Sequence, residues 1–331
     1  MANKRRRRRR KRSSHLGRNL LFVFILFSAI AATVKIALQP PEQKVDEPSV
    51  ALPVDNPNLS QEEAEALRSY YERKPSFYTI LVSGVDDGNG GSDTNILLAV
   101  DAANDYIYGV SIPRDTKASI NGKNRKINFA YNSGGMKLLS ETISHQLGIP
   151  VDYTVLVDLR GFEALVDAIG GVDFYIPVNM NYDDPYQNLS IHFSKGMRHL
   201  NGAEALKVVR FRHNNDGTGY GSEDIGRMQT QQDFLKAVAK QTLTPGNLLK
   251  IDSFVKIFQK YVETDLSLGN LAWLGAEAVG MGAEAVDFST LPGDWKSPYI
   301  YLDQTAVLEL VNQYLNPYVE DRLPEDLNIM S

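Results

Sequence analysis

Arginine residues gather in one stretch of the sequence in a pattern that suits an anion-binding site. Arg210 and Arg212 lie close together, and Arg227 and Gln231 follow further along the chain. The segment Val208–Arg212 is predicted to be extended, which would place its two arginines on one face, because side chains alternate along a strand. Arg227 and Gln231 have the i, i+4 spacing that shares a face on a predicted helix. Guanidinium groups match phosphate or carboxylate with charged planar donors, so this stretch predicts an anion site, with phosphate as the leading candidate.

Two further regions carry groups that suit a phosphate ligand. Arg114 directly follows a predicted strand, and Lys126 stands beside another strand-like run. Asp86 and Asp93 both lie in the glycine-rich loop Gly84–Asn95. Two carboxylates on one flexible loop can hold a hard cation such as Mg²⁺ together with phosphate oxygens. The sequence therefore offers cations for a phosphate and carboxylates for a metal ion.

Each of these groups also has a simpler structural interpretation. Asp, Asn and Gly fill turns in every kind of protein, so the loop residues are not specific by themselves. Arg114 can pair with the neighbouring Asp115 at the surface. The arginines of the first stretch can form salt bridges with acids nearby in the sequence, namely Asp216, Glu223 and Asp224. No single cluster decides between these interpretations.

The composition excludes several classes of function. The chain has no cysteine, which rules out a disulfide framework, cysteine catalysis and thiolate metal sites. Of its 35 Lys and Arg residues, 11 lie in residues 1–39, which contain no acid; the remaining 24 face 40 Asp and Glu residues, a net charge of −16. An acidic globular part argues against a nucleic-acid partner.

The N-terminal region has the pattern of a membrane anchor. A basic run, Lys4–Arg12, precedes the apolar segment Asn19–Leu38. About 20 apolar residues span a bilayer as a helix, and flanking cations favour the cytoplasmic side. We therefore expect a cytoplasmic tail over residues 1–18, one transmembrane helix over 19–38, and an extracytoplasmic remainder. Two alternatives stay open: Ala29-Ile30-Ala31 as the cleavage site of a signal peptide, and the basic run as a nucleic-acid-binding tail.

The remainder divides into a spacer, residues 39–75, and one domain, residues 76–331. Pro40–Asn58 lacks periodicity and predicts an extracellular spacer, and a capping box at Ser60 begins a short helix over Gln61–Arg73. Strands are predicted at Phe77–Ser83, Ile96–Val100, Tyr106–Ile112, Tyr153–Val157, Val172–Ile176 and Phe288–Leu291.

Helices and loops complete the predicted domain. Helices are expected over Met136–Leu147, Phe162–Ile169, Asn201–Lys207, Glu223–Thr242, Leu248–Tyr261 and Leu268–Met281, and Gln304–Leu315 closes the fold. Gly148 is the expected stop of the first of them. Asn181–Asn188 and His213–Ser222 are predicted to be loops, the second a mobile one. Strands and helices alternate without a strict βαβ period, so we predict a mixed α/β domain whose central sheet is flanked by helices.

Taken together and in order, the motifs resemble the LytR-CpsA-Psr family from about Phe77 to Val238. The resemblance rests on Gly84-Val-Asp86 with Ser92-Asp-Thr94, Ile112-Pro-Arg-Asp-Thr116, Lys126-Ile-Asn128, the segment Asp167–Asp173, Asn201–Leu206, Arg210-Phe-Arg212, and Gly226-Arg227 with Gln231-Gln232. Members are membrane-anchored extracytoplasmic enzymes of mainly Gram-positive envelopes. They move a glycopolymer, such as teichoic acid or a capsular or secondary wall polysaccharide, from an undecaprenyl-pyrophosphate carrier to peptidoglycan. The resemblance implies the same membrane location, fold and partners for this chain.

The resemblance also implies a role for each candidate residue. It implies Mg²⁺, with Mn²⁺ as the alternative ion, held by Asp86 and Asp93. It implies that the lipid pyrophosphate is bound by Arg114, Lys126, Arg210, Arg212 and Arg227, with Gln231 beside them. Phosphoryl transfer places charge on non-bridging oxygens, so the expected catalytic residues are Arg114, Arg210 and Arg212, with Asp93 as a base toward the acceptor hydroxyl.

Two positions depart from the family pattern. Gly91 and Thr230 stand where the family usually has arginine, so the expected pocket is less cationic. Three alternatives to the transferase remain: a pyrophosphatase that hydrolyses the lipid pyrophosphate, a non-catalytic module that binds lipid pyrophosphate or wall, and a transcriptional regulator. The predicted anchor and the acidic domain argue against the last.

Overall fold

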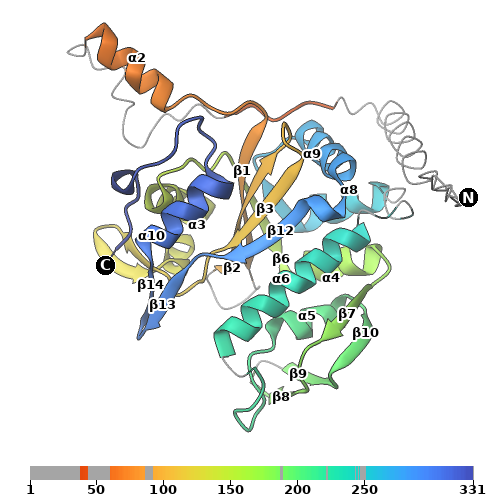
Figure 1. The fold of residues 1–331 in the computed structure, drawn as a ribbon. Helices are drawn as coiled ribbons and strands as arrows, with labels where there is room; N and C mark the ends of the chain where they lie inside the picture. Colours follow the sequence, from red (N-terminus) through yellow and green to blue (C-terminus); the bar gives the residue numbers. More distant parts are fainter. Residues whose placement is uncertain are drawn as a thin grey trace, which may run out of the picture.

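A six-stranded mixed β-sheet forms the centre of the structure (Figure 1). The computed structural model describes residues 38–43, 60–85, 92–186, 189–220, 223–242, 244, 246 and 251–330. The strand order is β11-β6-β1-β2-β3-β12, in which β6 pairs parallel with β1, β12 pairs parallel with β3, and the other pairs are antiparallel. The strands are β1 (Phe77–Val85), β2 (Ser92–Asp101), β3 (Tyr106–Ser111), β6 (Tyr153–Asp158), β11 (Val262–Thr264) and β12 (Val286–Thr290). This confirms the predicted mixed sheet.

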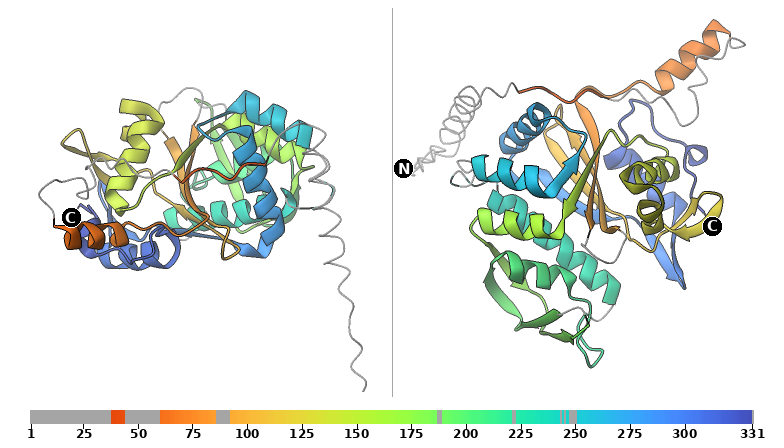
Figure 2. Two further views of the ribbon diagram at one scale, coloured as in Figure 1. Left: turned by 90° about the horizontal axis from the view of Figure 1, so that it is seen from above. Right: turned by 180° about the vertical axis from the view of Figure 1, so that it is seen from behind.

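Apolar side chains cover both faces of the sheet. Alternation along β1 sends Phe77 and Leu81 to one face, where they pack with the buried side of α3 (Asn128–Leu147) and with α10 (Gln304–Leu310). Tyr78 and Ile80 face the other way, toward α9 (Leu268–Met281), whose Trp273 meets the Tyr78 ring edge-on at 5.7 Å. The sheet is therefore a shared wall between two layers of helices, and Figure 2 shows these layers on either side of it.

A second core lies beyond one end of the sheet, among helices and two small two-stranded sheets. The helices are α4 (Leu159–Ala168), α5 (Gly202–Arg210), α6 (Glu223–Thr242) and α8 (Ile251–Tyr261), and the strands are β7 (Val172–Ile176), β8 (Met180–Asp184), β9 (Leu189–Phe193) and β10 (Gly196–Leu200), of which β7 pairs with β10 and β8 with β9. Phe211 and Phe234 are completely buried at its centre. Gly202 is needed where α5 begins, since a Cβ there would lie 2.2 Å from the Glu163 carbonyl oxygen of α4.

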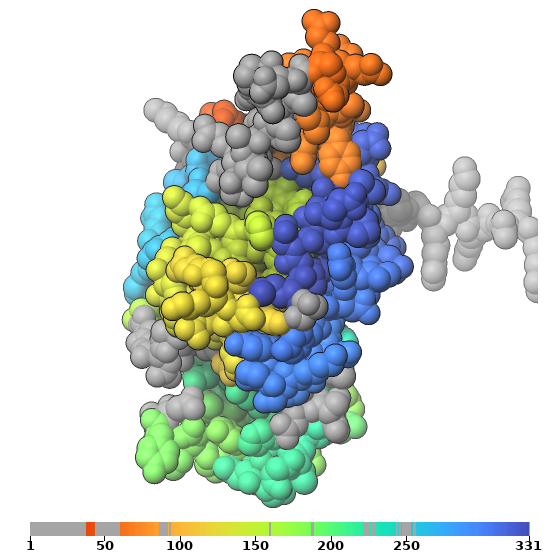
Figure 3. All heavy atoms as spheres, turned by 90° about the vertical axis from the view of Figure 1, so that its left-hand side faces the viewer, coloured from red at the N-terminus to blue at the C-terminus, as the bar shows by residue number. Residues whose placement is uncertain are grey.

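Two hairpins lie side by side on another face of the molecule (Figure 3). They are formed by β4 (Lys117–Ile120) with β5 (Lys123–Lys126), and by β13 (Gly293–Lys296) with β14 (Tyr299–Leu302). A bridge between Thr116 and Ile300 joins them. Asn121 and Gly122 form the tight turn between β4 and β5 with positive φ angles of 51° and 71°. The short helices η2 (Ala283–Ala285), η3 (Val311–Leu315) and η4 (Pro324–Asp326) complete the described fold.

Several helix boundaries follow the sequence signals. α6 and α9 have the predicted bounds. The capping box at Ser60 is present and begins α2 (Gln61–Tyr70), which ends earlier than predicted. Gly148 adopts the left-handed conformation, φ 66°, that closes α3. The start of α3 at Asn128 was missed because Gly134 and Gly135 break its regular backbone.

The prediction of an extended segment over Val208–Arg212 is wrong. Val208 to Arg210 form the last turn of α5, and Phe211 ends the helix with an extended backbone, φ −63° and ψ 135°. Asn201 and Glu204 form a capping box, and the buried Ala205 and Val208 continue one helical face to the end of the helix. Arg210 therefore projects from a helix end, not from a strand face shared with Arg212.

The two predicted loops are also more ordered than expected. Asn181–Asn188 contains most of β8 and leads into β9, with Met180 and Ile191 buried under the hairpin. The described part of His213–Ser222 is held by its own side chains. Asn214 and Asn215 accept hydrogen bonds from the backbone N–H groups of Asn181 and Asp183, both at 2.6 Å, so the loop is tied to the edge of β8.

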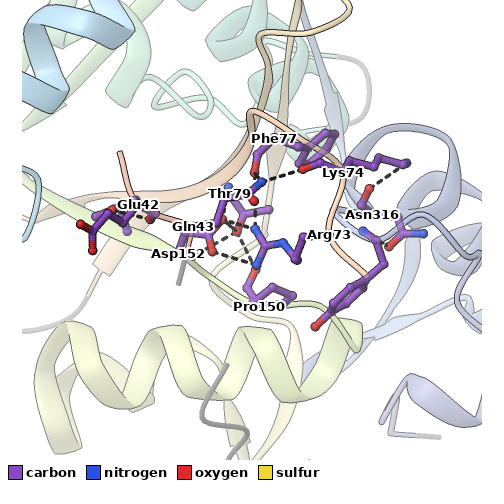
Figure 4. Close-up of polar contacts among 11 residues, drawn as sticks. Glu42, Gln43, Arg73, Lys74, Phe77, Thr79, Pro150, Asp152 and Asn316 are labelled. Atoms are coloured by element: carbon purple, nitrogen blue, oxygen red, sulfur yellow. Dashed lines mark hydrogen bonds and ion pairs between the residues drawn. The ribbon is translucent and has the colours of Figure 1, made fainter. Parts of the chain in front are cut away.

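A buried ion pair fixes the start of the domain (Figure 4). Both terminal nitrogens of Arg73 donate to the Asp152 carboxylate, at 3.1 and 2.8 Å, and the Thr79 N–H donates to the same carboxylate at 2.8 Å. The Asp152 side chain is fully buried. Gln43 donates to the carbonyl oxygens of Lys74 and Phe77 beside this pair.

Residues 38–43, at the start of the predicted spacer, lie across one edge of the sheet. The Gln39 N–H donates to the Gly269 carbonyl oxygen at 3.3 Å, and the Tyr153 hydroxyl donates to the Glu42 carbonyl oxygen at 2.6 Å. Tyr153 begins β6, so this edge is the one where β1 and β6 start. Among the residues that the structure describes, no helix is long and apolar enough to cross a bilayer. Residues 19–37 of the predicted anchor lie outside the described residues.

Candidate functional site

Four strands, β1, β3, β6 and β12, end on the side of the sheet opposite to residues 38–43. We call this side, where the carboxyl ends of these strands lie, the carboxyl-end edge. Val85 of β1 is opposite Asp158 of β6, and Ser111 of β3 is opposite Thr290 of β12. β2 begins at this edge with Ser92. In open α/β sheets, ligands bind outside the carboxyl ends of parallel strands. Arg114 lies on the segment that leaves β3 here, and Asp93 is the second residue of β2.

Arg114 and Lys126 are brought together by backbone pairing beyond β3. The Asn128 N–H donates to the Arg114 carbonyl oxygen at 3.3 Å, and the Ile127 N–H donates to that of Thr116 at 2.8 Å. Lys126 Nζ lies 2.8 Å from Asp115 Oδ1, and Arg114 Nε lies 4.0 Å from Asp115 Oδ2. The Asp115 carboxylate thus forms a close ion pair with Lys126 and a longer one with Arg114, and the two cations stay partly exposed, Arg114 at 29% and Lys126 at 39% of their side-chain surface. Arg114 pairs with Asp115, as the simpler interpretation expected, and it also lies near Lys126, as an anion site requires. The surface ion pair and the anion-binding role are therefore compatible.

The region predicted to bind metal lies at the start of β2. A register shift between Gly84 and Val85 interrupts the β1–β2 ladder at this point, where Val85 is opposite Ser92. Asp93 is therefore the second residue of β2, at the carboxyl-end edge. Asp86 and Gly91 lie outside the described residues, as does the Asp93 side chain.

Buried polar groups surround this end of the β1–β2 ladder. The Ser83 hydroxyl donates to Asn95 Oδ1 at 2.9 Å, and both residues are buried. Ser92 Oγ is buried and has no hydrogen-bond partner within the described part of the chain. The described residues contain no group of three or more acids or histidines that could hold a metal ion. The predicted Asp86–Asp93 set has the oxygen-only character that suits Mg²⁺.

Arg210 and Gln231 come together where α5 ends against α6. Gln231 Nε2 donates to the Val209 carbonyl oxygen at 2.8 Å. Carbonyl groups in the last turn of a helix have no partner within the helix, so this amide completes the end of α5 that carries Arg210. Phe211 is fully buried against Tyr220, and Arg212 is exposed. Gln231 thus supports Arg210 through the backbone.

α6 is tied to the same edge of the sheet. Gln232 Nε2 donates to Thr290 Oγ1 at 2.6 Å, at the end of β12. Lys236 Nζ lies 2.5 Å from Asp287 Oδ1, and this hydrogen bond lowers the pKa of Asp287. Arg227 is in the first turns of α6; its side chain lies outside the described residues. The two contacts place the start of α6 beside the carboxyl-end edge.

Asp158 is a further acid at this edge, and its carboxylate has a structural role as a helix cap. Its carboxylate caps α4 by accepting from the Arg160 N–H at 2.7 Å. A hydrogen bond from the Arg160 side chain holds the pKa of Asp158 below its usual value. Its charge is therefore compensated by its own neighbour.

Thr230, one of the two departures from the family pattern, faces the interior. It is 3% exposed, and its hydroxyl donates to the Gly226 carbonyl oxygen at 2.9 Å. A longer cationic side chain at this position would require the surroundings to move. Thr230 therefore adds no positive charge to the site, and the described cations of the site come from other positions.

The structure therefore forms two groups of predicted residues at one edge: Arg114 with Lys126, and Arg210 with Gln231. The sequence did not predict that Arg114 and Lys126 share Asp115 as a partner. It also did not predict the contact of Gln232 that attaches α6 to β12. The signal for Gln232 was available, because it follows Gln231 in a helix and therefore projects from a neighbouring face.

Comparison with known proteins identifies the family. Residues 45–316 match the LytR_cpsA_psr family. The chain belongs to this family. The match extends beyond the motifs on both sides, so that it includes the β13–β14 hairpin and α10 of this LytR_cpsA_psr domain.

Relatives and a solved structure support the same assignment. The polyisoprenyl-teichoic acid–peptidoglycan teichoic acid transferase TagU of Bacillus cereus is 34% identical over 71% of this chain and 77% of its own length. TagV of Bacillus subtilis, which has the same transferase description, is 30% identical over 75% of this chain and 66% of its own length. The crystal structure of B. subtilis TagV aligns with a TM-score of 0.61 and 29% identity, covering 74% of this chain and 98% of that one.

The contact between Gln231 and α5 leads to a testable expectation. We expect Gln231→Ala to weaken binding of inorganic pyrophosphate about three- to tenfold, because the last turn of α5 loses a hydrogen bond of about 0.5–1.5 kcal/mol. Isothermal titration calorimetry measures the affinity. Gln229→Ala is the matched control, since Gln229 is exposed on the same helix and contacts only Asp233 among the contacts described. Equal affinities for both variants would contradict a positioning role for Gln231.

Proposed function

We propose that this protein is a phosphotransferase that moves a glycopolymer from a polyisoprenyl-pyrophosphate carrier to peptidoglycan. The observation that carries the proposal is the 34% identity to a transferase named for this reaction, over most of that enzyme's length. The clustered cations at the carboxyl-end edge support it, since a pyrophosphate needs several charged donors. The predicted anchor supports a location at the outer face of the cell membrane, with the domain outside.

The proposed site assigns a role to each cation. Arg114 and Lys126 bind the pyrophosphate from the β3 side, and Arg210, Arg212 and Arg227 bind it from the side of α5 and α6. The acceptor hydroxyl attacks the phosphorus atom that bears the polymer. The bond between this phosphorus and the bridging oxygen of the pyrophosphate then breaks, and polyisoprenyl phosphate leaves. Charge grows on the non-bridging and leaving oxygens during this step, and fixed guanidinium groups stabilise it.

Two acids are proposed to complete the site. Asp86 and Asp93 would hold Mg²⁺, or Mn²⁺, which supplies positive charge to the phosphate oxygens when bound. Asp93 is also the candidate base for the acceptor hydroxyl, because it stands at the start of β2 on the same edge. Asp115 has a different role: it keeps Arg114 and Lys126 in place, through the ion pairs described above.

The test of the function is product analysis with the full-length protein, a lipid-linked polymer and peptidoglycan. We expect polymer covalently attached to peptidoglycan, with one polyisoprenyl phosphate released for each polymer transferred. A chelator should stop transfer, and added Mg²⁺ should restore it. Release of free polymer without attachment would instead identify a pyrophosphatase, and tight donor binding without turnover would identify a non-catalytic module.

A further inference from the structure

A hollow of about 260 Å³ opens between the two surface hairpins. It is lined by Arg125, Lys126, Asn128, Phe129, Pro298 and Tyr299. Pockets that enclose a whole drug-sized ligand usually have about 300–1,000 Å³. This hollow is therefore of a size for one unit of a longer molecule. The neighbouring hairpins that form it are visible in Figure 3.

Two cations that line this hollow each lie near an exposed aromatic ring. The Arg125 guanidinium lies over the Phe129 ring, 5.4 Å from its centroid, and Lys126 Nζ lies 5.8 Å from the centroid of the Trp295 ring. Phe129 is 42% exposed and Trp295 is 52% exposed. Such pairs hold a cation in place while leaving its donors available to an anion. The exposed rings offer flat apolar surface, which suits the carbon–hydrogen faces of sugars or polyols.

The hollow is fixed in place by the fold. The Tyr299 hydroxyl donates to the Asn124 carbonyl oxygen at 3.3 Å, and the Ile300 N–H donates to the Asp115 carbonyl oxygen at 2.9 Å. These bonds join β14 to both the β4–β5 hairpin and the segment that carries Arg114. An exposed acid, Asp294, lies on β13 next to Trp295, but alternation along the strand directs the two side chains to opposite faces.

Lys126 connects the hollow to the cations at the sheet edge. It lines the hollow and also pairs with Asp115, which neighbours Arg114. A ligand that extends from a pyrophosphate at Arg114 can therefore continue along Lys126 to Arg125. This cationic path is distinctive on a chain that carries a net charge of −16 beyond residue 39.

We propose that this hollow binds one charged repeat of the anionic glycopolymer that the donor carries. Arg125 and Lys126 receive the phosphate or carboxylate of the repeat, and Phe129 and Tyr299 pack against its sugar or polyol. The proposal rests on the transferase function and adds a binding subsite to it, namely one for a charged repeat of the transferred polymer. Charge complementarity with a repeated anion, and continuity with the pyrophosphate cations, favour the donor polymer over the peptidoglycan acceptor.

A binding experiment tests the hollow without any turnover. The full-length protein is titrated with soluble poly(glycerol phosphate), and with neutral dextran as the reference polymer. We expect poly(glycerol phosphate) to bind, more weakly as salt is added, and Arg125→Ala and Phe129→Ala each to weaken binding about tenfold. Lys137→Ala is the charge-matched control, because its side chain is 87% exposed on α3 and does not line the hollow.

A kinetic experiment separates this proposal from the transferase function. Arg125→Ala should lower kcat/KM about tenfold for a donor that carries the charged polymer, and leave it unchanged for a lipid-pyrophosphate disaccharide without charged repeats. The proposal would be overturned if Arg125→Ala changed kcat/KM, relative to the wild type, by the same factor for both donors in an enzyme that still transfers polymer. An Arg125→Ala variant that raises KM only for a peptidoglycan fragment would overturn it as well. If no transfer occurs at all, the function fails, while the titration still decides whether the hollow binds the polymer.

Discussion

Replacing Arg114 with alanine is expected to lower kcat for transfer by about a hundred- to a thousandfold. Removing one preorganised donor to a developing oxyanion costs about 2.7–4 kcal/mol of barrier, and Arg114 stands directly after β3, at the carboxyl-end edge. Its carbonyl oxygen is bonded to Asn128, so the backbone that presents the side chain is fixed. Release of polyisoprenyl phosphate under saturating donor measures the effect.

Two companion variants make this result specific. Arg114→Lys keeps the charge but loses the planar fork, so its kcat should lie between those of the wild type and the alanine variant. Arg68→Ala removes an equally charged but exposed side chain from α2 and should leave kcat unchanged. An alanine variant as active as the wild type would remove Arg114 from the site. A thermal melt confirms that the compared variants are folded.

Replacing Asp152 with alanine is expected to cause the largest loss of stability, about 3–5 kcal/mol. Its carboxylate is fully buried, while its partner Arg73 is 12% exposed. Removing one member of a buried pair leaves the other charge without its compensation. The Thr79 N–H would also lose its 2.8 Å acceptor. Urea denaturation measures the change in the free energy of unfolding.

Matched variants distinguish the buried pair from an ordinary surface pair. Asp152→Asn keeps an acceptor for Thr79 and should cost less than alanine. Glu141→Ala breaks an exposed pair with Lys137, 4.0 Å apart, and should change stability by no more than about 0.5 kcal/mol. A loss for Asp152→Ala as small as that for Glu141→Ala would show that the ion pair does not hold the start of the domain.

The sequence predicted the central elements because their signals are local. The capping box at Ser60, the glycine stop at Gly148 and the bounds of α6 and α9 all follow from short-range chemistry. The extended reading of Val208–Arg212 failed for a non-local reason. β-branched residues such as Val208 and Val209 favour strands in isolation, whereas here the burial of Ala205 and Val208 against the second core continues the helix.

The contacts that support the candidate site residues could not be predicted from the sequence. Motif order placed Arg114 and Lys126 in one site, but only the fold shows that Asp115 holds both. Gln231 was predicted beside the pyrophosphate, whereas its amide nitrogen donates to the Val209 carbonyl oxygen. Such partners lie far apart in the chain and carry no periodic signal. The catalytic, metal-binding and pyrophosphate-binding roles assigned to all the candidate site residues stay predictions.

The attachment of residues 38–43 to one side of the sheet determines how far the candidate site lies from the predicted anchor. Gln39 and Glu42 are bonded where β6 and α9 begin, whereas Arg114 follows the far end of β3. The nine residues of β1 separate these two edges, and at about 3.3 Å per residue the distance is roughly 26 Å. If residues 19–38 form the predicted anchor, the candidate phosphate site would lie on the side of the domain that faces away from the membrane, and the tail of a lipid-linked donor would have to span this distance.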